Sequence, residues 1–157
     1  MDHKLGYHLW ATDKLLDHLD SLEDSVFHAE IQSVFPSIER TLYHQYEVDA
    51  LWFSRLRKQE RPLEVDRFST ASECKKYFQK LHREIAEWEY EGGDILYQTS
   101  DGEAFENATE EILYHIVNHG TYHRGNISAM LWQLGEKGVS TDYIYYVREK
   151  EERENES

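Results

Sequence analysis

The chain has 157 residues, the size of one domain, and its 17 Lys and Arg against 31 Asp and Glu leave a formal net charge of −14 that disfavours binding to nucleic acid. Apolar residues make up 39% of the chain and aromatic residues 13%, which excludes a disordered polypeptide. The single cysteine, Cys74, excludes an internal disulfide and a cysteine-based zinc site. Because there is also no signal segment and no apolar stretch of membrane length, we expect a cytoplasmic protein without a membrane partner.

The first half of the chain carries two segments with helical spacing of apolar residues. Only Pro36 and Pro62 are present, so long stretches lack the residue that most strongly breaks helices. Leucines at steps of three and four residues predict a first helix over 5–22. A second helix is predicted over 36–58, because Pro36 suits a first helical turn and a largely apolar stripe follows it.

The second half carries two more helices, with a change of period between them. A capping box at Thr70 begins a predicted helix over 70–91, which is expected to end at a Gly-Gly pair. An Asp-Gly pair within 95–105 indicates a short hairpin. A fourth helix is predicted over 109–134, where acidic residues occupy the first turn and isoleucines recur on one face.

Four amphipathic helices predict an all-α, four-helix bundle, because each helix must bury its apolar face against the others. Residues 1–147 are expected to form this single domain in an up-and-down-like order. The long connection between the third and fourth helices predicts a crossover there, which holds the hairpin. Residues 148–157 are rich in Glu and contain no apolar side chain, which predicts a disordered acidic tail.

Three of the nine histidines lie at steps of four residues in the last predicted helix. His119 and His123 are expected to point toward the core, with His115 at its edge. Imidazoles in a core need partners for their ring nitrogens, and a divalent metal bound also by His44 would supply one. The alternative is hydrogen bonding to carboxylates and tyrosines without a metal. The remaining five are predicted to be surface or helix-edge residues: His3, His8, His18, His28 and His82.

The sequence around these histidines resembles a known family. The run 112–127 contains His-x3-His-x3-His-Arg-Gly and is preceded by His44 and Trp52. In these features the chain is similar to the DinB family of bacterial metal-binding, four-helix proteins. The resemblance covers nearly the whole chain, because 7–11 and 142–146 are similar to the opening and closing segments of the family.

The resemblance implies a DinB/YfiT-like bundle that holds one divalent metal ion, zinc or nickel, on His44, His119 and His123. His115 matches a position that is not usually counted as a ligand. Asp49 and Arg124 are candidates for hydrogen bonds that orient the ligand imidazoles, and a simple Asp–Arg or Asp–solvent pairing is the alternative. Two glycines are costly inside a helix and are predicted to allow close packing or leave room beside the metal: Gly120 and Gly125.

Three protein ligands leave one coordination position for water or substrate, as in catalytic metal sites. Such an ion activates water for hydrolysis or holds a thiolate for attack on an electrophile. The resemblance favours the second reaction, because the wider superfamily includes thiol S-transferases that use low-molecular-weight thiols. A non-catalytic, metal-binding stress-response module is the alternative. The resemblance and the many aromatic residues also predict a homodimer.

Overall fold

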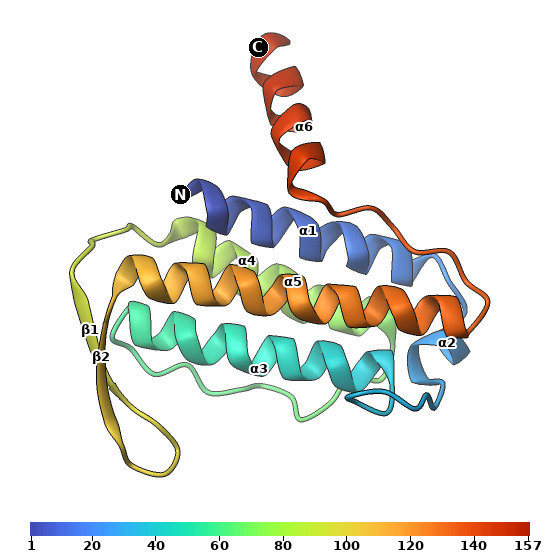
Figure 1. Cartoon of the computed structure of the whole chain (residues 1–157), viewed down its shortest axis with the longest axis horizontal. Helices are drawn as coiled ribbons and strands as arrows, with labels where there is room; N and C mark the ends of the chain where they lie inside the picture. Colours follow the sequence, from blue (N-terminus) through green and yellow to red (C-terminus); the bar gives the residue numbers. More distant parts are fainter.

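A computed structural model describes the whole chain, residues 1–157, and is mostly helical (Figure 1). This confirms the predicted all-α class. Four long helices form the bundle, and they match the four predicted segments with ends that differ by a few residues: α1 (His3–Asp20), α3 (Ile38–Leu56), α4 (Ala71–Glu87) and α5 (Thr109–Gln133). The remaining elements are α2 (Asp24–His28), β1 (Asp94–Gln98), β2 (Ala104–Ala108) and α6 (Tyr143–Asn155).

Side-chain caps fix the starts of three bundle helices. Asp2 accepts hydrogen bonds from the backbone of the first turn of α1, and the Thr70 hydroxyl accepts one from Glu73 at the start of α4. At α3 the cap is Ser37, whose Oγ accepts from the backbone N–H of Arg40 at 3.1 Å. The helix therefore begins after Ser37, and the prediction that Pro36 forms its first turn is wrong.

The predicted end of the third bundle helix, at a Gly-Gly pair, is also wrong. α4 ends at Glu87, and Trp88 leaves the helix in an extended conformation. Its indole packs edge-on against Phe53, with ring centroids 6.2 Å apart, where the chain leaves the helix. Gly92 and Gly93 adopt φ values of 69° and 82° and instead lead into β1.

The four helices pack at the corners of a square. α1 and α3 each pack against α4 and α5, so α1 lies diagonally opposite α3, and α4 lies opposite α5. α1 and α5 run in one direction, whereas α3 and α4 run in the other (Figure 1). Apolar side chains from all four helices meet in one core, with Leu16, Leu42, Leu81 and Ile127 essentially unexposed. Burial of each such side chain contributes about 1.5–3 kcal/mol.

The crossover is not where the sequence predicted it. Residues 57–70 return along the length of α3 between two parallel helices, whereas the α4–α5 connection stays at one end and forms the β1–β2 hairpin (Figure 1). The returning segment is fixed to α3 by side chains of that helix. Tyr43 donates to the carbonyl of Val65 at 2.8 Å, and the carboxylate of Glu39 accepts from the buried N–H of Phe68 at 2.9 Å. The predicted hairpin itself is confirmed.

The C-terminal segment differs from the disordered tail predicted over 148–157. α6 continues to Asn155 and projects away from the bundle (Figure 1). None of its residues is buried, but Lys150 pairs with Glu154 and Glu149 with Arg153 at four-residue spacing. Each such pair stabilises an exposed helix by about 0.2–0.5 kcal/mol, so the pairs support the helix where it has no apolar residue. No helix of the structure has the length and apolar character needed to cross a lipid bilayer.

Candidate metal centre

Antiparallel packing of α3 against α5 brings the three predicted ligands together. The Nε2 atom of His119 lies 3.2 Å from Nε2 of His44 and 3.1 Å from Nε2 of His123. One ring nitrogen from each residue lies within 4.8 Å of the others. His123 is buried, and the other two rings are half-buried. These three side chains can hold a metal ion.

The spacing of these nitrogens suits a metal better than hydrogen bonding alone. Two imidazole nitrogens bound to one tetrahedral zinc at about 2.0–2.1 Å lie about 3.3 Å apart, close to the separations seen here. A neutral imidazole carries one N–H, and the Nδ1 atoms of His119 and His123 are buried without a hydrogen-bond partner. Without a metal, Nε2 of His119 offers either one N–H or one lone pair, so it forms a good hydrogen bond with only one of its two histidine neighbours. A shared cation binds one nitrogen of each ring, and the Nδ1 atoms lack a partner in the chain in either case.

The surroundings favour the neutral imidazoles of His119 and His123. Burial, and then the neighbouring His123, lower the pKa of His119 to about 4, although the charge of Asp49 acts in the opposite direction. Burial, and then His44, also lower the pKa of His123. Metal ligation requires the neutral form of histidine. At neutral pH, His119 and His123 therefore each have a ring-nitrogen lone pair available to a metal.

An aromatic wall that the sequence did not indicate encloses one side of the triad. Phe35 stacks on His44 with ring centroids 4.8 Å apart and lies 5.9 Å from the ring of His123. Tyr122 packs edge-on against His123 from its own helix. Phe35 precedes α3 in an irregular segment, where no periodic signal marks a functional residue. Its ring shields the ligands from solvent and limits their rotation.

Behind the triad lies a second polar cluster, formed by His8, Asp49 and Arg124. All three side chains are buried, and His8 Nε2 lies 2.7 Å from Asp49 Oδ2, while Arg124 Nη1 lies 3.4 Å from His8 Nδ1. The prediction that His8 is a surface or helix-edge residue is thus wrong. The same prediction is wrong for His82, which is buried and whose Nδ1 lies 2.8 Å from Asp13 Oδ1. His8 stands between the two predicted orienting residues, so they do not form a direct Asp–Arg pair.

One of the two predicted glycines has a steric reason. An added Cβ at Gly120 would lie 2.4 Å from the His8 ring and 2.8 Å from Arg124 Nη1, so the cluster fits only beside glycine. An added Cβ at Gly125 meets no atom within 4 Å, and the predicted need for space there is wrong. The absence of a side chain at Gly120 therefore allows His8 and Arg124 to pack directly against the helix that carries His119 and His123.

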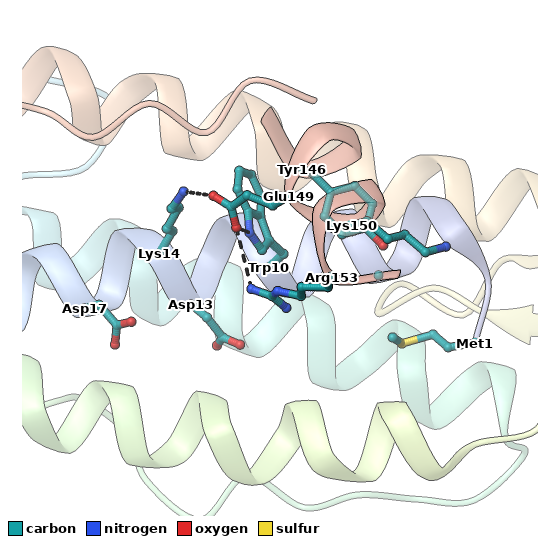
Figure 2. Close-up of a pocket in the computed structure, with 10 residues that line it drawn as sticks. Met1, Trp10, Asp13, Lys14, Asp17, Tyr146, Glu149, Lys150 and Arg153 are labelled. Carbon is teal, nitrogen blue, oxygen red and sulfur yellow. Dashed lines mark hydrogen bonds and ion pairs between the residues drawn. The ribbon is translucent and has the colours of Figure 1, made fainter. Parts of the chain in front are cut away.

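His115 lies outside the triad, at the edge of the core as the sequence predicted. Its ring is exposed and 5.9 Å from that of His119, and it packs edge-on against Trp52 at 5.1 Å. Beside it is a cavity of about 290 Å³ between α3, α5 and the hairpin. A larger cavity of about 570 Å³ lies away from the triad, between α1 and α6, where Lys14 and Trp10 both bind Glu149 (Figure 2).

Known proteins are similar to this chain in sequence and in fold. The DinB family matches residues 1–155. Protein DinB of Bacillus subtilis (strain 168) is 33% identical over 154 residues, which cover 90% of each chain. A DinB-like protein from Bacillus cereus ATCC 10987, solved by crystallography, has the same fold with a TM-score of 0.64 and 17% identity, over 86% of this chain and 91% of that one.

Proposed function

This chain belongs to the DinB family, and we propose that it is a metal-dependent enzyme that joins a low-molecular-weight thiol to a small electrophilic molecule. The convergence of one ring nitrogen from each of three histidines of α3 and α5, all within 4.8 Å of one another, carries this proposal. Three protein ligands on a tetrahedral ion leave one position open, which is typical of catalytic sites rather than structural ones. A divalent ion on His44, His119 and His123 would hold a thiol as its nucleophilic thiolate.

The proposed reaction is a substitution that needs no oxidant or reductant. The thiolate sulfur attacks an electrophilic carbon, a carbon–sulfur bond forms, and the bond from that carbon to its leaving group breaks with its electron pair. The proton of the thiol passes to solvent or to the leaving group. No side chain beside the triad needs to act as a separate base, because the thiol has already lost its proton.

The chain's own residues orient the ligands and limit the access of water. One oxygen of Asp49 is held by His8, and the other, Oδ1, is buried without a partner, as are the Nδ1 atoms of His119 and His123. A carboxylate that accepts from the second ring nitrogen of a ligand fixes the orientation of the ring and raises its basicity. We assign this role in the metal-loaded protein to Asp49, which is held by His8, and His8 in turn contacts Arg124. Phe35 closes the apolar side.

The direct test pairs glutathione-like and bacillithiol-like thiols with chlorodinitrobenzene or an epoxide. The protein should be purified without a nickel column, analysed for its metal, stripped, and reloaded with zinc or nickel. We expect the turnover to disappear on chelation and in His44→Ala, and to persist in His28→Ala, an exposed histidine on α2. A rate that survives both chelation and His44→Ala would show that the metal is not responsible.

Two other functions correspond to distinct outcomes of this experiment. Turnover of esters without thiol would identify a metal-dependent hydrolase, in which bound water is the nucleophile. No turnover, together with a sharp fall in melting temperature on metal removal, would identify a non-catalytic stress-response module that the ion stabilises. Imidazole ligands suit both zinc and nickel, so element analysis of the native protein decides the metal.

We also propose that the protein is a cytoplasmic homodimer. The single cysteine, Cys74, is buried and unpaired, which suits a reducing compartment. On α5, Tyr114 and Trp132 are 62% and 72% exposed, and such aromatic residues are enriched at interfaces. Light scattering should give twice the chain mass of 18.7 kDa at micromolar concentration. A mass equal to that of one chain would refute the dimer.

A further inference from the structure

The cavity beside His115 has the composition of a binding site for an organic cation. Its volume is about 290 Å³, and its lining residues are Trp52, Tyr97, Asn107, Glu111, Ile112 and His115. Trp52 packs edge-on against both Tyr97 and His115, with ring centroids 5.0 Å and 5.1 Å apart. Indole and phenol rings attract cations to their faces through the negative charge of the π-system.

One carboxylate in the cavity has no partner within the protein. Glu111 is exposed in the first turn of α5 and forms neither an ion pair nor a side-chain hydrogen bond, so its carboxylate is free to pair with a ligand. Glu111 and His115 are four residues apart on α5 and so lie on one side of the helix. The guanidinium of Arg55 already lies over Trp52 and Tyr97, 4.5 Å from each ring centroid, and donates to the carbonyl of Gln98, but Arg55 does not line the cavity.

The cavity is also close to the candidate metal centre. His115 lines the cavity, and its ring centroid lies 5.9 Å from that of His119. His119 in turn lies next to His44. None of the three triad residues lines the cavity, so a small molecule bound to an ion on the triad would reach Glu111 by extending over the ring of His115. The net charge of −14 further favours a positively charged molecule over a negatively charged one.

We propose that this cavity binds the ammonium group of the small molecule whose reactive group is held at the triad. Glu111 supplies the opposite charge, and Trp52 and Tyr97 supply aromatic contacts. The inference rests on the proposed function, in that it names the substrate class of the same site: amine-bearing molecules in preference to neutral or anionic ones.

The test compares two ligands of equal length, aminohexanethiol and mercaptohexanol, by calorimetric titration of the zinc-loaded protein. We expect the amine to bind about tenfold more tightly, as one ion pair and one cation–π contact at a partly exposed site allow. Glu111→Gln should remove most of this preference. Glu106→Gln is the matched control, because it removes the same charge from β2 on the hairpin face opposite Tyr97 and Asn107.

A second measurement does not depend on the metal or on turnover. Hexylammonium added to the metal-free protein should shift the indole N–H signal of Trp52 in NMR spectra, and hexanol should not. Equal affinity for both thiols, a preference that survives Glu111→Gln, or no shift of the Trp52 signal would each overturn the ammonium site. If the preference holds but no electrophile is consumed, the binding site stands and the transferase fails. Turnover of the electrophile without a preference for the amine would support the transferase and overturn the ammonium site.

Discussion

Two histidine clusters lie side by side in this bundle, and they differ in how far the chain itself satisfies them. His8 is fully buried, yet one ring nitrogen is bonded to Asp49 and the other faces Arg124. The triad histidines are less buried, yet the Nδ1 atoms of His119 and His123 lack partners and the Nε2 atoms crowd together. Burial alone therefore does not mark a ligand site. Ring nitrogens of several residues that converge on one point do.

Two cavities of the molecule show a similar contrast. Between α1 and α6, Glu149 is shared by Lys14, Trp10 and Arg153, so the charges that line the larger cavity are largely used within the chain (Figure 2). Near the triad, the smaller cavity keeps an unpaired carboxylate at Glu111. The smaller cavity has more capacity left for a ligand, although its volume is about half as large.

The largest effect should come from removing a triad member. In His123→Ala we expect stoichiometric binding of zinc or nickel to fall from one ion per chain to none detectable, because a direct bond and the geometry of the other two ligands are lost. Element analysis after dialysis against the metal measures this. One retained ion per chain in both His123→Ala and His119→Ala would show that the ligand set is wrong.

Next in size is the steric coupling between the clusters. Gly120→Ala should lower the free energy of unfolding by about 1–3 kcal/mol, the usual range for overpacking, because the new Cβ meets the His8 ring, which its bond to Asp49 holds in place. Denaturant unfolding measures the loss. The control is the same change in a His8→Ala background, where the contact is gone and the added cost should shrink. Equal costs in the two backgrounds would contradict the coupling.

A smaller effect is expected from pH in the metal-free protein. The folded pKa of His119, about 4, lies below its ordinary value of 6.5. Folding thus favours the neutral ring, and this contribution to stability is complete above pH 6.5 and is lost as pH falls toward 4. His123 acts in the same direction. Because His119 is partly exposed, the change should be modest.

Unfolding by urea across this pH window measures that change. His119→Gln is the control, because glutamine cannot gain a proton and the other titrating groups are kept. Its stability should fall less steeply with decreasing pH than that of the wild-type chain. Identical slopes for the two proteins would mean that the environment of His119 does not suppress its protonation.

The sequence predicted the features that depend on residues close together along the chain, and it missed those that depend on residues far apart. Helical period and caps are local, so the four bundle helices and the spacing of His119 and His123 could be read directly. The third ligand, His44, came from the helix pattern together with the family resemblance. His8 was missed because its partner Asp49 is 41 positions away and Arg124 is 116 away, and spacing along the chain carries no sign of such contacts. The helix over the C-terminal segment was missed because its second half has no apolar residue, although the four-residue charge pairs there were readable.

The smallest effect should come from the third histidine of α5, which belongs to neither cluster. His115 shares the four-residue spacing of the ligands, but its ring is exposed and its one close contact on another helix is the edge of Trp52. In His115→Ala we expect one metal ion per chain to remain, with a change in unfolding free energy within about 0.5 kcal/mol, because the lost contact is partly offset by the better helix propensity of alanine. Element analysis and denaturant unfolding of the same sample measure both quantities. Loss of the ion would place His115 among the ligands and would mean that helical spacing, rather than the convergence of Nε2 atoms, identifies the site.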